Sequence, residues 1–327
     1  MIRFRKWILI LGVLLVVLLL AGVVSLFIGV VNILPFGRWP DFYQTILFEI
    51  RLPRILLGCI VGAGLAVSGA VFQGLLRNPL ADPYILGTSS GAALGASLGL
   101  LLKLDSFSYG LPLTAFLFSI LALMLVYGIA NSGGRMQLQV LLLAGVIVST
   151  FLAALVMLVM SLAKREVQEI IFWIMGNLGQ TDYVFIRVVG IMVLAGCAGV
   201  YVFARDLNII SLGEEKAVYL GIEAEKVKKI LFVVTALIVG AVVSISGMIG
   251  FVGLIIPHLV RLIVGPDHRI LLPASGLVGA IFLILSDTLA RTIAAPIEIP
   301  VGVITALFGA PFFIFLLIRQ RKKIKIV

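Results

Sequence analysis

The sequence is poor in charge. Asp, Glu, Lys and Arg make up 12% of its 327 residues, whereas a soluble protein carries about 25%. Apolar residues account for 62%, which is enough for about ten membrane-spanning helices of about 20 residues each. This composition excludes a water-soluble enzyme, a disordered regulator and a nucleic-acid binder. It predicts an all-α, polytopic transmembrane helical bundle.

Cysteine and histidine are also scarce. Cys59 and Cys197 both lie inside apolar runs, so they cannot form a disulfide framework, which needs several cysteines in exposed loops. His258 and His268 have no cluster of cysteines or acids nearby, so no metal site is expected. We predict that the chain holds no cofactor.

The chain lacks the phosphate-binding pattern G-x-x-x-x-G-K-[ST]. If ATP drives its action, a separate subunit must hydrolyse the ATP. Charged residues are missing from the middle of the predicted spans, which argues against a secondary active carrier coupled to protons or sodium. Asp287 and Arg291 lie at the end of one span, where their i,i+4 spacing allows them to pair. A scaffold or an intramembrane enzyme is a further alternative, but the spans contain no Ser/Lys, Asp/Asp or His/Glu constellation.

Nine uncharged stretches are long enough to cross a membrane. They are Trp7–Gly37, Ile55–Leu76, Pro83–Leu102, Ser106–Gly134, Met136–Ala163, Val188–Ala204, Ile230–Val260, Ile270–Ser286 and Ile299–Ile318. Ile170–Thr181 is too short to cross, and residues 164–182 are therefore expected to form a short helix on the outer side. Trp7–Gly37 lacks a cleavage site and is interpreted as a retained first span.

The stretch Ile230–Val260 is expected to cross twice. Lysines precede it and Arg261 and Arg269 follow it, so both of its ends favour the cytoplasm. Gly247, Gly250 and Gly253, with Pro257 after them, predict the break between two short helices. Ten crossings result. We expect the chain to lie in a prokaryotic inner membrane, with both of its termini on the cytoplasmic side. In this orientation the inner segments carry the whole net charge of +10, as the positive-inside rule requires.

Small residues recur every four positions in two of the spans. Such spacing places them on one helix face, where two backbones can approach closely. The second span has Gly58, Gly62, Ala66, Ala70 and Gly74, and the third has Gly91, Gly95 and Gly99.

Two surface segments suggest contacts with partners. Residues 205–229 form the one sizeable inner loop, and we interpret them as two short helices separated by Gly221, with Leu212 and Gly213 opening the first. A charged, amphipathic loop below a helix bundle could contact a soluble ATP-hydrolysing subunit and transmit its movements to the membrane helices. On the outer side, Arg51 and Arg54 flank the start of the second span and could anchor at the membrane surface or grip acidic side chains.

In this order, the motifs resemble those of the permease subunits of type II ABC importers, which take up iron–siderophore complexes, haem and vitamin B12. The matching segments are RLPR (51–54), SGAVFQGLLRNPLADPYILGTSSGA (68–92), LLLAG (141–145), LG-x6-LG (212–221), FVGLIIPHLVRLIVGPDHRILLP (251–273), SDTLAR (286–291), EIPVG (298–302) and TALFGAPFF (305–313). They cover nearly the whole chain, so residues 1–327 are expected to form a single permease domain.

The resemblance implies a homodimer with two ATP-binding subunits below it and a substrate-binding protein outside. It implies that Arg51, Arg54 and Arg291 dock the binding protein. It also implies that Leu212, Gly213, Glu214, Ala217, Leu220 and Gly221 couple to the ATPase, and that Asn78, Leu80, Leu138 and Gln139 form the cytoplasmic gate. At the last site the segment Gln137-Leu138-Gln139 replaces the small hydroxyl residues of some family members. The implied cargo is a metal chelate, with ferric siderophore favoured over vitamin B12 and haem.

Overall fold

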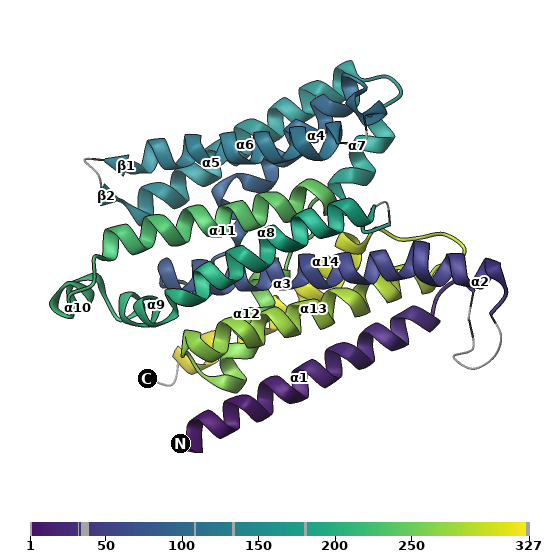
Figure 1. The fold of residues 1–327 in the computed structure, drawn as a ribbon. Coiled ribbons are helices and arrows are strands. Elements are labelled where there is room, and N and C mark those ends of the chain that lie inside the picture. Colours follow the sequence, from purple (N-terminus) through teal and green to yellow (C-terminus); the bar gives the residue numbers. More distant parts are fainter. Residues whose placement is uncertain are drawn as a thin grey trace.

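The computed structural model describes residues 2–31, 33, 39–107, 109–132, 135–179 and 182–324. These residues form an elongated bundle of helices (Figure 1). The α-helices are α1 (Ile2–Phe27), α2 (Asp41–Thr45), α3 (Leu52–Leu75), α4 (Thr88–Leu101), α5 (Gly110–Ala130), α6 (Leu138–Leu162), α7 (Val167–Ile174), α8 (Tyr183–Val202), α9 (Ala204–Ser211), α10 (Glu214–Tyr219), α11 (Ala224–Ser246), α12 (Val252–Val264), α13 (His268–Thr292) and α14 (Val301–Ile324). A π-helical segment (Ile46–Arg51) joins α2 to α3, and the two-residue strands β1 (Asn131–Ser132) and β2 (Arg135–Met136) pair antiparallel, with Asn131 opposite Met136.

The predicted all-α membrane bundle is confirmed. Among the described residues, seven helices are long and apolar enough to cross a membrane: α1, the continuous segment Asp41–Leu75, α5, α6, α8, α11 and α13. The shorter apolar helix α12 and the Val301–Phe315 part of α14 pack against α13, and α4 packs against α5.

The long apolar stretch after Lys229 is broken, as predicted. Helix α11 ends at Ser246, and α12 begins only at Val252. Gly247 has a φ of +65°, and a Cβ at this position would lie 2.1 Å from the Trp173 carbonyl oxygen, so α7 covers the break. The Asn177 amide donates to the Ser246 carbonyl at 2.9 Å. Protein therefore satisfies backbone groups that lipid could not.

One detail of that prediction is wrong. Pro257 lies inside α12 and does not mark the break. It is the sixth residue of the helix, beyond the four N–H groups that lack an intrahelical partner, so it removes one intrahelical bond, to the Gly253 carbonyl, and the helix continues.

The four-residue repeat of small side chains packs α3 tightly against α13. A Cβ on Gly62 would lie 2.3 Å from the Gly279 carbonyl oxygen, and a Cβ on Gly279 would lie 2.4 Å from the Gly62 carbonyl oxygen. A Cβ on Gly74 would lie 2.7 Å from His268 Nε2 of α13, whereas a Cβ on Gly58 would make ordinary contacts, with Ile284 Cγ1 at 3.6 Å. The glycine face of α4 meets α5, where a Cβ on Gly95 would lie 2.4 Å from the Thr114 carbonyl oxygen.

Residues 205–229 contain one more short helix than predicted. The helix that Leu212 and Gly213 open is α10, and Gly221 (φ +77°) separates it from the helical residues that follow, as predicted. The additional helix is α9, which Gly213 (φ +131°) separates from α10. Residues 224–229 form the first turns of the spanning helix α11, because the apolar pattern of that helix continues through Val227 and Leu231, both of which are buried.

Figure 1 shows which features share an end of the bundle. Helix α1 begins, and α14 ends, at the end that also carries α9, α10 and the β1–β2 pair; we call this the terminal end. Helices α2 and α7 lie at the opposite end, which we call the far end.

Candidate functional site

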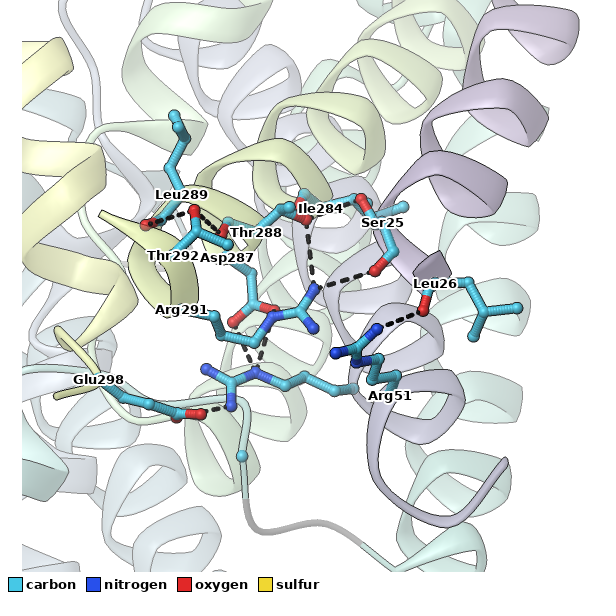
Figure 2. A network of polar contacts seen from close by, with 12 residues as sticks. Ser25, Leu26, Arg51, Ile284, Asp287, Thr288, Leu289, Arg291, Thr292 and Glu298 are labelled. Carbon is cyan, nitrogen blue, oxygen red and sulfur yellow. Dashed lines mark hydrogen bonds and ion pairs between the residues drawn. The ribbon is translucent and has the colours of Figure 1, made fainter. Parts of the chain in front are cut away.

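An ionic cluster lies at the far end, where α3 and α13 meet (Figure 2). Arg54 Nε lies 2.8 and 3.0 Å from the two carboxylate oxygens of Asp287, and its Nη1 lies 2.8 Å from Glu298 Oε2. Arg54 is 5% exposed and Asp287 is 2% exposed, whereas the Glu298 side chain is 48% exposed. The contacts of the Arg54 guanidinium with two carboxylates offset the free-energy cost of burying its charge.

Arg291 joins this cluster from α13. Its Nε lies 3.1 Å from Asp287 Oδ2, close enough for an ion pair but not aligned as a hydrogen bond. The predicted i,i+4 pair is thus confirmed. Its Nη2 contacts Thr288 Oγ1 at 3.3 Å and the Ser25 carbonyl at 3.4 Å, and the Thr288 hydroxyl bonds the Ser25 hydroxyl at 2.7 Å. The cluster therefore ties α1 to α13.

Arg51 ends the π-helical segment that precedes α3. A wider π turn redirects a side chain relative to a regular helix, and here the guanidinium turns toward the end of α1. Its Nη1 donates to the Leu26 carbonyl at 2.9 Å, and its Nη2 donates to the Val31 carbonyl.

The structure brings all three predicted docking arginines together, but it buries them. Arg51 and Arg291 are each 4% exposed. In this structure the guanidinium groups of Arg51 and Arg54 bind atoms of the chain itself and are not free to reach outward. The sequence contains no local signal for this burial, because the acceptors lie on α1, α13 and the segment before α14.

The predicted gate residues come from two segments at the terminal end. In the turn after α3, Asn78 Oδ1 accepts from the Leu80 amide at 2.9 Å, and Leu80 is exposed. Leu138 begins α6, and Gln139 is exposed beside it. A cavity of about 650 Å³ opens there, and it is lined by Leu76, Arg77, Met136, Gln137, Leu138, Gln139, Glu214 and Glu225. Gln139 thus shares a cavity with Glu214 of α10, whereas Asn78 and Leu80 do not line it.

Helix α10 presents an exposed apolar surface at the terminal end. Leu212, Val218, Tyr219 and Leu220 are exposed, and Tyr219 reaches 89%. Ala217 is 0% exposed and faces the rest of the chain. Of the predicted coupling residues, Leu212 and Leu220 are therefore accessible and Ala217 is not. Gly213 and Gly221, both with positive φ, delimit the helix.

Helix α9 is fastened to the start of α13. Asn208 Nδ2 donates to Asp267 at 2.9 Å, and Asn208 Oδ1 accepts from the His268 backbone amide at 2.8 Å. The Arg269 guanidinium bound to Asp267 holds the pKa of that carboxyl well below its usual range. These contacts give the loop around α9 a fixed attachment to the bundle.

Sequence reasoning missed a second ionic cluster, between α10 and α11. Lys228 Nζ lies 3.1 Å from Glu214 Oε1 and also bonds Glu225. The Lys228 side chain is only 1% exposed. The i,i+3 spacing of Glu225 and Lys228 was visible in the sequence, but the approach of Glu214 depends on the tertiary fold.

The chain belongs to the FecCD transport family, whose model matches residues 10–319. It is 46% identical to a cobalamin import system permease, BtuC, of Halobacterium salinarum, over 85% of this chain and 74% of that protein. It is 40% identical to the hemin transport system permease HmuU of Yersinia pestis, over 96% and 97% of the two chains.

A solved structure described as an inward-facing metal-chelate type ABC transporter superposes with a TM-score of 0.87. It is 37% identical, and the match covers 95% of this chain and 99% of that one. The chain is therefore a permease of the type II ABC importers and a multi-pass membrane protein. It is a transport subunit, and a separate subunit of such a transporter hydrolyses ATP.

Proposed function

We propose that this permease admits a bulky metal chelate to the cell, that the chelate is a ferric siderophore, and that ATP hydrolysed by two partner subunits drives the uptake. The observation that supports this most strongly is the family match over residues 10–319. A second candidate cargo is cobalamin, which is favoured by the 46% identity to a cobalamin import permease. Haem is a third, since a hemin permease is 40% identical.

In this proposal the chain works as a homodimer in a prokaryotic inner membrane. The terminal end faces the cytoplasm, and the far end faces outward. This orientation places the basic segments inside. It would also direct the exposed apolar side chains at α10 toward the ATP-binding subunits. Leu138 and Gln139, which line the cavity at this end, would then form the cytoplasmic gate with Asn78 and Leu80 of the turn after α3.

The substrate-binding protein would dock at the far end, over the arginine cluster. Arg54 and Arg291 pair with two carboxylates, Asp287 and Glu298. Arg51 adds a third guanidinium, which donates to backbone carbonyls, so the cluster has one surplus positive charge. Glu298 is half-exposed and is the partner that a carboxylate of the binding protein could replace. Docking through Arg54 would then require an exchange of ionic partners.

The cargo is tested by transport in lipid vesicles. The complex of permease and ATP-binding subunits is reconstituted with its cognate binding protein, and each of three probes is supplied separately: ferrichrome, cyanocobalamin and haemin. We expect ATP-dependent accumulation of ferrichrome. Accumulation of one of the other two instead would replace the cargo assignment, and accumulation of none would contradict the proposed function.

The contact with the ATP-binding subunits is tested at Tyr219. We expect Tyr219→Asp to weaken co-purification of those subunits by about tenfold or more, because exposed aromatic residues dominate the binding energy of protein interfaces. Glu223→Gln is the control, since Glu223 is exposed but lies outside α10. Equal recovery of the ATP-binding subunits with Tyr219→Asp and with the control would contradict the contact.

A further inference from the structure

The cluster of Arg77, Glu214, Glu225 and Lys228 joins three parts of the chain that the proposed function treats separately. Glu214 belongs to α10, Glu225 and Lys228 to the first turns of α11, and Arg77 to the turn after α3. Lys228 lies between the two carboxylates, and Arg77 Nη2 lies 3.5 Å from the same Glu214 oxygen that Lys228 contacts. Two cations thus share one carboxylate oxygen of Glu214.

On one side, the cluster contacts the segment before α6 through Glu225. Glu225 uses one oxygen for Lys228 and the other, Oε2, to accept from the Met136 backbone amide at 3.0 Å. Met136 is 4% exposed and precedes Gln137, the residue that caps α6. Only Gln137 and Leu138 therefore separate Met136, which makes this hydrogen bond, from Gln139.

On the other side, the cluster contacts the turn after α3 through Arg77. Arg77 directly precedes Asn78 and has a φ of +49°, an uncommon conformation for a residue other than glycine. Both gate segments are therefore connected to Glu214, one through Arg77 and the other through Lys228 and Glu225.

A glycine lies on each side of helix α10. Gly213 and Gly221 flank it with φ values of +131° and +77°, and a side chain at either position would meet no atom within 4 Å. Glycines in open space can absorb changes in φ and ψ as hinges do. A displacement of α10 would consequently be transmitted by its side-chain contacts rather than by the chain on either side.

Burial distinguishes Lys228 from an ordinary surface lysine. An ammonium group that is 1% exposed is stable only while its carboxylate partners stay in place. Lys226, two residues earlier, is 69% exposed and lies 3.9 Å from Glu223, as is usual for a surface pair. Lys228 therefore couples the position of Glu214 to that of Glu225, whereas Lys226 does not.

We propose that Lys228 is a positioning residue that transmits movement of α10 to the gate segment at Met136–Gln139. This inference rests on the proposed function, in which α10 receives motion from the ATP-binding subunits. Lys228 would contact neither cargo nor nucleotide. Its role would be to keep Glu214 and Glu225 together, so that the amide of Met136 follows α10.

The test measures the accessibility of a gate residue, so its result does not depend on which cargo is carried. The complex of permease and ATP-binding subunits is placed in lipid nanodiscs with a thiol introduced by Gln139→Cys, in a background of Cys59→Ala and Cys197→Ala. With Lys228 present, we expect ATP and vanadate to change the rate of thiol labelling by about fivefold or more, the lower range of allosteric couplings. With Lys228→Met we expect that response to be lost while ATP hydrolysis continues, and with Lys226→Met we expect it to be retained.

The variant should fold, because the Glu214 and Glu225 side chains are 41% and 34% exposed and water can solvate them when Lys228 is absent. Glu225→Gln provides a second variant, in which the same loss of response is expected although Lys228 remains. A full labelling response in both variants would overturn the inference, as would a response that falls only in proportion to ATP hydrolysis. If labelling does not respond to ATP even with Lys228 present, the proposed function itself fails.

Discussion

Gly62→Ala is expected to destabilise the folded chain by about 3 kcal/mol or more, at the upper end of the usual cost of overpacking. The added methyl group would lie 2.3 Å from the Gly279 carbonyl oxygen and 2.7 Å from its carbon. These are backbone atoms of α13, so no side-chain rotation can relieve the clash. The helices α3 and α13 would have to separate along the face where they pack most closely. The measurement is the melting temperature of the purified protein in detergent.

Gly128→Ala is the matched control. Gly128 also lies within a spanning helix, α5, but a Cβ there would meet nothing within 4 Å. Alanine favours helix over glycine by about 1 kcal/mol, so the melting temperature should be unchanged or higher. Equal melting temperatures for Gly62→Ala and the original sequence would show that α3 and α13 are not packed as described.

Asp287→Asn is expected to cost about 3 kcal/mol, because removing one partner of a buried ion pair leaves an uncompensated buried charge. Asp287 is the one acid in the described part of the chain that contacts both Arg54 and Arg291. Arg54 would retain Glu298, but Arg291 would keep only the neutral oxygens of Ser25 and Thr288. The melting temperature in detergent again measures the effect.

Glu298→Gln removes the same charge from the same cluster at a half-exposed position. Its cost should stay below about 1 kcal/mol, as for other solvent-exposed pairs. If Glu298→Gln lowered the melting temperature as much as Asp287→Asn does, burial would not be the property that distinguishes the two carboxylates.

The features predicted correctly from the sequence are those set by local, periodic patterns. Helix length follows from the length of each apolar run, and the face of Gly58, Gly62 and Gly74 follows from their four-residue spacing. The break between α11 and α12 followed from basic residues on both sides of a stretch too long for one span and too short for two. The thickness of the bilayer and the preference of basic residues for the cytoplasm are enough to predict these features, without knowledge of the tertiary fold.

The features that were missed depend on residues distant in sequence. The Arg54 guanidinium contacts carboxylates 233 and 244 residues away, so its burial could not be read from the RLPR segment. Residues 205–229 are predicted to form a charged loop, but Lys228 lies in the first turns of α11 and is buried beside Glu214 and Glu225. Ala217 and Tyr219 lie on the same short helix, and only the tertiary structure shows that the first faces inward and the second outward.

The two ends of the bundle differ in how their charges are held. At the far end, Arg54, Asp287 and Arg291 are almost completely buried and join α3 to α13, with Ser25 adding α1. At the terminal end, Lys228 is buried, but its acidic partners are open to water. We expect the far end to be the more rigid of the two, and the terminal end to be the one that moves with ATP hydrolysis.

The central claim is that this chain forms a pathway but cannot drive transport by itself. The measurement that tests it most directly is the vesicle assay described above, repeated with the permease alone. Without the ATP-binding subunits, we expect no accumulation of any of the three chelates above the outside concentration, even when proton and sodium gradients are imposed. Accumulation against a concentration gradient by the permease alone would contradict the account.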